Sequence, residues 1–316
     1  MIALKCNCDD VKRNGKDRKG NQRMKCRDCS RTWTVRESKP LGDMRIDQGR
    51  AVMALKMLLE GMSIRATERI TSLHRDTICD LILTVGKNCK SFLDRTVVDV
   101  EVDDVQCDEI WSFVGCKEKT KKRKGYEAGD IGDCWTFVAV ERNTKLVLAH
   151  HVAKRTDTRD FLFKLRKATS GRFQLSSDGW GGYTNNVPYI FRNDVDFGQL
   201  IKSYKSEQAE TRYSPAQITA IEKKAVFGSP DPDNICTSHV ERLNLTLRMN
   251  LRRFTRLTNA HSKSWVHHEA MQNILFAWYN FCRVHASLEK QTPAMASGLA
   301  DRVWSVEKLL HECVQI

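Results

Sequence analysis

Three acidic residues stand at positions where their carboxylates could bind divalent metal ions. Asp108 lies in the middle of an apolar segment, Asp178 closes another, and Glu241 opens a helical segment. A charge inside an apolar strand is costly unless it is paired or bound to a metal. Two divalent cations about 3.5–4 Å apart support phosphodiester chemistry when carboxylates converge to hold them. Together the three residues indicate a metal-dependent site for phosphodiester chemistry.

Each carboxylate also has a purely structural interpretation. Glu109 follows Asp108 and points to the other face of the same strand, so alternation alone does not choose between them. Asp178 precedes a glycine and could simply form a turn. Glu241 could complete a capping box that Ser238 begins. The metal interpretation therefore depends on the three residues acting together.

The elements that would position these residues follow from hydrophobic patterning. We expect strands at residues 105–114, 134–141, 145–152, 173–177 and 202–204 and a helix at 157–169, with the chain helical again from residue 238 through 269–281 to the end. This order predicts an α/β domain over residues 103–300, with a mixed sheet flanked by helices, and a C-terminal helix within 301–316. Antiparallel first strands followed by a helical crossover are the order of the ribonuclease-H-like fold.

Four of the 12 cysteines gather near the N-terminus, within residues 1–37: Cys6, Cys8, Cys26 and Cys29. Two close pairs on turns can supply the four soft ligands of tetrahedral Zn²⁺. The first pair is one residue shorter than the usual knuckle, and Trp33 is the expected packing residue. We expect a zinc ribbon here, with free thiols in a basic tail as the alternative.

Residues 44–95 have helical periodicity and predict a helix-turn-helix. Ser63 caps a helix that runs to about residue 70, and after a short turn a second helix begins near Arg75. The apolar residues expected to pack the two helices together are Ile64, Ala66, Ile70, Leu73, Ile78, Leu81 and Ile82. The residues at the start of the second helix, His74, Arg75 and Thr77, would reach base edges. An ordinary helical hairpin is the alternative.

The charge balance favours a polyanionic partner. Lys and Arg total 52 against 39 Asp and Glu, a net charge of +13, which favours binding to double-stranded DNA. No apolar run approaches the ~18 residues of a membrane span. The first residues lack the features of a secretory signal, so we expect a cytoplasmic protein without a membrane partner.

Further cationic and amide side chains could contact DNA phosphates. Asn244 and Arg248 share the helix face of Glu241, and Arg252 and Arg253 continue the basic run. A lysine-rich segment, residues 117–124, is expected to be a loop, in which Lys119, Lys121, Lys122 and Arg123 could contact phosphates. A solvated charged face is the alternative for this loop.

At these residues the chain resembles the InsAB-type transposases of bacterial insertion sequences. The resemblance covers nearly the whole length and is most specific in QCDEIWSF (106–113), SDG (177–179), PDPD (230–233), TSHVERLN (237–244), RRFTRLTNA (252–260), YNFCRVH (279–285) and TPAM (292–295). It implies a DDE transposase in which Asp108, Asp178 and Glu241 hold Mg²⁺ or Mn²⁺, which selects Asp108 over Glu109. The short first cysteine pair departs from the family pattern.

The resemblance also implies a reaction and its partners. Such an enzyme binds the ends of an insertion sequence and catalyses metal-dependent DNA cleavage and strand transfer. We expect at least two protomers on DNA, because each end needs an active site, and association with the nucleoid. The alternatives are a zinc-ribbon and helix-turn-helix regulator without catalysis, and a ribonuclease-H-like nuclease that cuts without joining.

Overall fold

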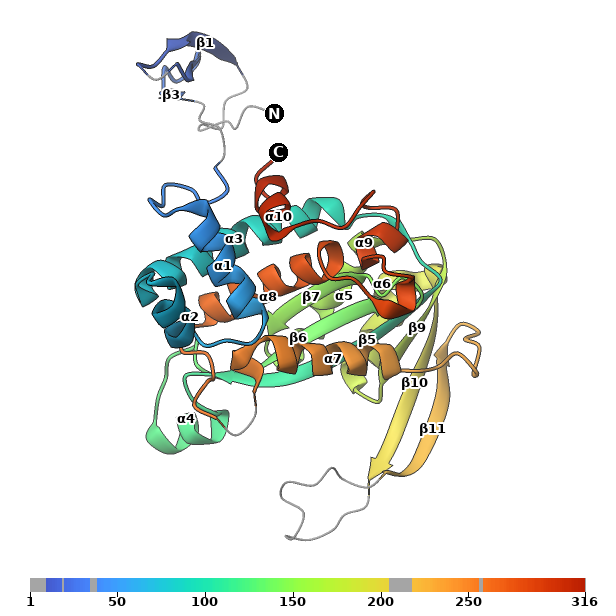
Figure 1. The fold of residues 1–316 in the computed structure, drawn as a ribbon. Helices are drawn as coiled ribbons and strands as arrows, with labels where there is room; N and C mark the ends of the chain where they lie inside the picture. The colour runs from blue at the N-terminus through green and yellow to red at the C-terminus, as the bar shows by residue number, and fades with distance from the viewer. Residues whose placement is uncertain (1–9, 19, 35–38, 205–217, 256–257, 316) are drawn as a thin grey trace.

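The computed structural model describes residues 10–18, 20–34, 39–204, 218–255 and 258–315. A small three-stranded sheet lies near the N-terminus, a helical region follows, and a six-stranded sheet with helices on both faces makes up most of the chain (Figure 1). None of the helices formed by these residues combines the length and apolar composition needed to cross a bilayer.

The large sheet is mixed, as the sequence predicts. Its strands are β5 (Asp104–Val114), β6 (Gly132–Glu141), β7 (Val147–Ala153), β9 (Phe173–Asp178), β10 (Val195–Tyr204) and β11 (Ile218–Phe227). They lie in the order β11-β10-β9-β5-β6-β7. β9 runs parallel to both β5 and β10, and the other neighbours are antiparallel. The central pair β5 and β9 therefore presents the same end of both strands at one edge of the core.

Helices cover both faces of this sheet. α5 (Thr158–Ala168) and α6 (Gly181–Phe191) lie on one face, and α7 (Ser238–Asn250) and α8 (Trp265–Phe281) on the other. Phe137 of β6 stacks on Phe161 of α5, with ring centroids 5.5 Å apart. On the opposite face, His150 of β7 is hydrogen-bonded to Asn273 of α8 at 2.7 Å. Alternation along each strand thus supplies both layers.

The helical region contains α1 (Gln48–Leu59), α2 (Ile64–Thr71) and α3 (Arg75–Thr96). The expected cap is present, because the Ser63 hydroxyl accepts a hydrogen bond of 3.1 Å from the amide of Ala66. The expectation for Ile70 was wrong, because its side chain is 55% exposed. Thr67 and Thr71, one helical turn apart, are buried in its place, which turns Ile70 toward solvent.

The helical region and the sheet share one hydrophobic core, which extends from Leu41 to Cys313. α3 lies along α8 (Figure 1). Their crossing is close at Gly86, where an added Cβ would lie 2.5 Å from the carbonyl oxygen of Ala270. The C-terminal α10 (Val306–Glu312) packs on α1 and α3. The two long helices α3 and α8 therefore join the helical region to the sheet.

Four elements differ from the sequence-based expectation, and the first is β10, which was expected only at 202–204 but begins at Val195. The lysine-rich segment expected to be a loop is the helix α4 (Glu118–Lys124), which ends at Gly125 with a positive φ of 65°. Lys, Arg and Glu favour helix, and glycine favours this left-handed cap. α6 and β11 were not expected. α6 follows a glycine-rich turn and contains Pro188, and most of β11 is exposed and lacks apolar alternation.

The remaining elements are short. They are β1 (Val11–Lys16), β2 (Gln22–Cys26), β3 (Thr32–Thr34), β4 (Val100–Glu101), β8 (Thr169–Ser170), α9 (Pro293–Ala296) and the 3-10 turns η1 (Arg155–Asp157), η2 (Arg192–Asp194), η3 (Arg252–Phe254) and η4 (Ala286–Leu288).

Candidate metal centre

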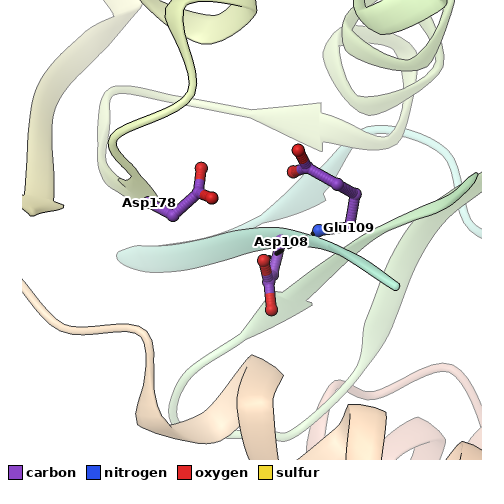
Figure 2. A group of neighbouring side chains, drawn as sticks. All are labelled: Asp108, Glu109 and Asp178. Atoms are coloured by element: carbon purple, nitrogen blue, oxygen red, sulfur yellow. Dashed lines mark hydrogen bonds between the residues drawn. The ribbon is translucent and has the colours of Figure 1, made fainter. Parts of the chain in front are cut away.

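The register of β5 and β9 brings two of the expected carboxylates together. Cys107 of β5 pairs with Ser177 of β9, so Asp108 and Asp178 follow at the same level on neighbouring parallel strands. In the part of the chain that the structure describes, one acidic group could hold a metal ion: Asp108, Glu109 and Asp178, each with one oxygen within 4.8 Å of the others (Figure 2). This cluster can bind a divalent cation.

Asp108 and Glu109 point to opposite sides of β5, as alternation predicts (Figure 2). The carboxylate of Asp108 accepts hydrogen bonds from the side-chain amide of Asn244 at 2.8 Å and from the backbone amide of Glu109 at 2.9 Å. Among the described residues no ion pair involves Asp108. Its charge therefore has hydrogen-bond donors beside it but no cationic partner.

Glu109 has a different environment. Its Oε1 accepts two hydrogen bonds from the Arg155 guanidinium, at 3.0 and 2.9 Å, and its Oε2 accepts one of 3.3 Å from the Tyr183 hydroxyl. Its side chain is only 3% exposed. The bidentate pair compensates the buried charge, so the structure gives Glu109 a partner that Asp108 lacks.

The electrostatics of the cluster disfavour three bare negative charges. Burial first, and then the charges of Asp178 and Glu109, raise the pKa of Asp108 to about 7. Burial likewise raises the pKa of Asp178, and it raises that of Glu109 despite the opposing Arg155. A hard divalent cation prefers carboxylate oxygens and would offset this repulsion. The donor set and its electrostatics therefore fit such an ion.

Glu241 lies outside this acidic group, on α7. Its carboxylate forms an ion pair with Lys202 of β10 and accepts a hydrogen bond of 2.7 Å from the Thr237 hydroxyl. Among the described residues it makes no capping-box hydrogen bond with Ser238, and α7 is preceded by Thr237 as its cap residue. The charge of Glu241 contributes to the raised pKa of both Asp108 and Asp178. The negative charge of Glu241 on α7 is therefore close enough to Asp108 and Asp178 to disfavour their ionisation.

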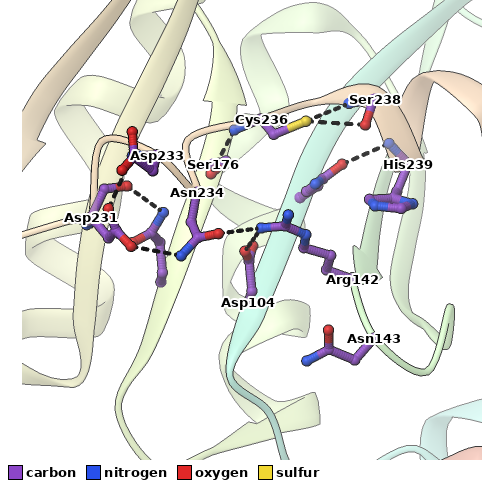
Figure 3. Close-up of polar contacts among 12 residues, drawn as sticks. Asp104, Arg142, Asn143, Ser176, Asp231, Asp233, Asn234, Cys236, Ser238 and His239 are labelled. Carbon is purple, nitrogen blue, oxygen red and sulfur yellow. Dashed lines mark hydrogen bonds and ion pairs between the residues drawn. The ribbon is translucent and has the colours of Figure 1, made fainter.

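The start of α7 is anchored directly to β5. The side-chain oxygen of Gln106 accepts hydrogen bonds from the amides of His239 at 2.9 Å and Val240 at 3.3 Å. Arg142, which follows β6, donates hydrogen bonds of 2.9 Å to Asp104 of β5 and 2.8 Å to Asn234 in the loop before α7 (Figure 3). These contacts set the position of the helix that carries Glu241 relative to Asp108.

The residues expected to contact DNA lie in three places. His74 and Arg75 are exposed at the start of α3, and Thr77 is half-buried. On α4, Lys119, Lys122 and Arg123 are exposed, whereas the Lys121 ammonium donates to the carbonyl of Ile131 at 3.3 Å. Near the cluster, Asn244 is buried against Asp108, Arg248 and Arg253 line a pocket, and Arg252 is exposed.

Two of the four expected zinc ligands are described. Cys26 ends β2, and Cys29 follows in the turn before β3, where its amide donates to the Cys26 sulfur at 3.5 Å. Met24, Cys26 and Trp33 form a small separate core, which confirms Trp33 as a packing residue. Cys6 and Cys8 lie outside the described residues. The Cys26–Cys29 turn is compatible with a metal knuckle.

Sequence reasoning missed three residues that contact these carboxylates: Arg155, Lys202 and Tyr183. Lys202 lies in a segment expected to be a strand, but its partner Glu241 is far away in sequence. Arg155 follows β7, and only the three-dimensional fold brings it to Glu109. The pairing of Asp108 with an adjacent Glu109 was the one signal that two carboxylates of this strand could share a site.

Comparison with known proteins gives a limited similarity. The sequence matches no protein-family model. It is 28% identical over 166 residues to the insertion element iso-IS1n protein InsB of Shigella dysenteriae, across 52% of this chain and 86% of that protein. Among solved structures, the piggyBac transposase synaptic complex with hairpin DNA aligns with 84% of this chain and 69% of its own, with a TM-score of 0.39 and 10% identity.

Proposed function

We propose that this chain is a DNA transposase of the DDE type, which cuts the ends of an insertion sequence and joins them to target DNA. The observation that carries the proposal is the pair Asp108 and Asp178, held side by side on neighbouring parallel strands. The similarity to an insertion-element protein supports the same class of activity. We assign the catalytic domain, residues 103–300, to the ribonuclease-H-like fold.

Asp108, Asp178 and Glu241 are the residues that we propose hold Mg²⁺ or Mn²⁺. Bound there, divalent cations would supply Lewis-acid activation of a phosphodiester. The chain's own part is to orient the ligands: Asn244 holds one oxygen of Asp108, and Gln106 fixes the start of the helix that carries Glu241. Glu109 serves instead to position the strand through Arg155.

Binding of metal would redistribute the partners of Glu241. In the structure its carboxylate contacts Lys202, and a metal ion between the strand ends and α7 would compete with that ammonium. Lys202 would then be free of Glu241 and could contact the DNA backbone as a cation. The ion pair therefore keeps Glu241 compensated when the site holds no metal.

The N-terminal parts would deliver the enzyme to its DNA. We propose a zinc ribbon in residues 1–37 with Cys6, Cys8, Cys26 and Cys29 as ligands, and a helix-turn-helix in 44–95 that reads the element ends through His74, Arg75 and Thr77. The residues proposed to contact phosphates are Lys119, Lys121, Lys122, Arg123, Asn244, Arg248, Arg252 and Arg253. The working assembly is a homo-oligomer of at least two chains on double-stranded DNA, in the cytoplasm with the nucleoid.

The experiment is a cleavage and strand-transfer assay with the full chain, linear DNA carrying the element's ends, a supercoiled target plasmid and Mg²⁺. The proposal expects cleaved ends and joined products that both require the metal. Cleavage without joining would indicate a nuclease, and end binding without either reaction would indicate a DNA-binding regulator.

A further inference from the structure

A pocket of about 460 Å³ opens at the C-terminal end of β5, the strand that carries Asp108. This volume is within the ~300–1,000 Å³ range of small-molecule pockets. Its walls combine aromatic rings with cationic side chains. The residues that matter here are Trp111, Phe113, His261, Lys117, Arg248 and Arg253.

The aromatic residues form a continuous platform. The rings of Trp111 and Phe113 have centroids 5.7 Å apart, and the ring of His261 lies 4.6 Å from that of Phe113 with 31° between their planes. Trp111 is 40% exposed although it is large and apolar. The ammonium of Lys117 lies over both rings of β5, 5.5 Å from Trp111 and 5.9 Å from Phe113. The rings are tilted to one another, and an exposed, polarisable ring such as that of Trp111 suits stacking by a nucleobase.

The cationic wall contains a charge without a carboxylate partner. The guanidinium of Arg253 donates to the carbonyl of His267 at 2.6 Å and to the hydroxyl of Ser262 at 3.4 Å. Within the described part of the chain, no acidic side chain forms an ion pair with it. Burial lowers the pKa of Arg253 to about 10, so the group is still charged at neutral pH. A partly buried guanidinium with neutral partners favours an anionic ligand such as a phosphate.

The pocket is aligned with the metal centre. β9 pairs with β5 as far as Cys107, so the edge of β5 that continues from Asp108 leads toward the pocket. Trp111 is three residues beyond Asp108, roughly 10 Å at strand spacing, and by alternation it lies on the face of β5 that carries Glu109. On α7, Glu241, Asn244 and Arg248 share one face, and Arg248 reaches the pocket. Strand β5 beyond Asp108 and the α7 face that carries Glu241 therefore both lead from the metal centre to the pocket.

We propose that this pocket binds one unpaired nucleotide of the DNA strand at the metal centre. Its base stacks on the exposed ring of Trp111, and its phosphate contacts Arg248 and Arg253. A paired base inside a duplex cannot present its face to the platform, so the site favours a strand that is locally unpaired near the cleavage position. This inference rests on the proposed function and defines the state of its DNA substrate.

The test measures binding of the full chain to fluorescein-labelled DNA by anisotropy in buffer without added Mg²⁺, Mn²⁺ or chelator, so that catalysis does not contribute and the proposed zinc site keeps its metal. A short single strand is compared with a blunt duplex of the same sequence. Trp111→Ala should weaken single-strand binding about tenfold or more, because stacking one base contributes ~1–3 kcal/mol, and should change duplex binding less than about twofold. Trp111→Phe should restore most of the affinity, since phenylalanine keeps the π-face.

Tyr189→Ala provides the matched control. Tyr189 is an exposed aromatic residue (64%) with the Arg159 guanidinium over its ring at 5.4 Å, but it lies on α6, away from the pocket. A second readout uses 2-aminopurine in the single strand, whose fluorescence should be quenched by the wild type and Trp111→Phe but not by Trp111→Ala.

The outcomes separate the two proposals. If the wild type binds neither single-stranded nor duplex DNA, the proposed function fails and the inference fails with it. If it binds duplex DNA but Trp111→Ala leaves single-strand binding and quenching unchanged, only the inference is overturned. An equal loss for Tyr189→Ala would also overturn it, because the effect would not be specific to the pocket.

Discussion

The side-chain amide of Asn244 on α7 donates a hydrogen bond of 2.8 Å to the carboxylate of Asp108 on β5. Asn244 is buried, and its own side-chain oxygen has no hydrogen-bond partner among the described residues. A buried unpaired acceptor is costly, so this arrangement is maintained by the tight packing of α7 on the strand. The contact connects the helix that carries Glu241 directly to the first carboxylate of the cluster.

Replacing Asn244 should therefore affect metal binding before it affects folding. We expect Asn244→Ala to raise the Mg²⁺ concentration needed for half-maximal cleavage by ~10–100-fold, which is the usual effect of removing an outer-shell partner. Thr246→Ala on the same helix is the matched control and should leave this concentration unchanged. A metal titration of cleavage checks the prediction, and an unaltered Mg²⁺ requirement in Asn244→Ala would contradict it.

Asp108 should lower the stability of the metal-free protein at neutral pH. Its pKa is raised from 3.8 to about 7 by folding, so the folded chain holds the proton more tightly than the unfolded chain. The corresponding stability is present below about pH 4 and is lost as pH rises to about 7. We expect Asp108→Asn to unfold at a higher temperature than wild type at pH 8 in EDTA. Its free energy of unfolding should exceed that of wild type by at most about 4 kcal/mol.

Thermal melts across pH 4 to 8 check this expectation. The difference in melting temperature between Asp108→Asn and wild type should become smaller toward pH 4. At pH 8, Mg²⁺ should also reduce this difference, because it stabilises the wild type alone. Asp130→Asn, at an exposed carboxylate, should show no such pH dependence. A lower melting temperature for Asp108→Asn in EDTA at pH 8 would refute the electrostatic account of the cluster.

The sequence predicted the strands around the site because their apolar character is local. β5, β6, β7 and β9 each carry several buried side chains, and their expected bounds agree with the structure to within a few residues. α6 was missed because Pro188 and its glycine-rich start favour a turn, although Tyr183, Val187 and Phe191 are buried at helical spacing. The strand β11 is formed by pairing with β10, which its exposed residues do not encode.

The composition of the site was less predictable than its location. The sequence placed Asp108 and Asp178 at strand positions, and the parallel register brings them together. The partners that distinguish Glu109 from Asp108 come from segments distant in sequence, Arg155 and Tyr183 for one and Asn244 for the other. Alternation along a strand shows which face a residue occupies, but it does not show which charged side chains lie next to it on that face.

The N-terminal segment should contain zinc. A small basic segment with a core of three buried residues has too little apolar surface to fold without a bound metal. Metal analysis of the full chain purified without chelator should find about one zinc per chain. Cys26→Ser and Cys29→Ser should lose it, whereas Cys116→Ser should keep it. Absence of zinc from the wild-type protein would rule out the ribbon.

The start of α3 should read DNA sequence, and α4 should bind DNA without reading it. Arg75→Ala should weaken binding to the element's end by ~1–3 kcal/mol and relax the base preference. Lys122→Ala should weaken binding equally for all sequences. Lys122 is a better residue to mutate than Lys121, because the Lys121 ammonium donates a hydrogen bond to a backbone carbonyl. Gel-shift titrations with end DNA and scrambled DNA test both variants. An unchanged base preference in Arg75→Ala would contradict the assignment of α3 as a recognition helix.

The central claim is that Asp108, Asp178 and Glu241 form one metal-binding unit. Asp108→Asn, Asp178→Asn and Glu241→Gln should each abolish Mg²⁺- or Mn²⁺-dependent cleavage and joining while end binding persists. Glu109→Gln should keep measurable cleavage, because Glu109 is not one of the proposed metal ligands and glutamine can still accept a hydrogen bond from Arg155.

Glu241→Gln is the most direct measurement, because Glu241 lies on α7 and contacts Lys202 rather than the acidic group. Cleavage, joining and gel-shift assays are run side by side on Glu241→Gln and the wild type. The account predicts normal end binding with no metal-dependent joined product. Robust Mg²⁺-dependent joining by Glu241→Gln would contradict it.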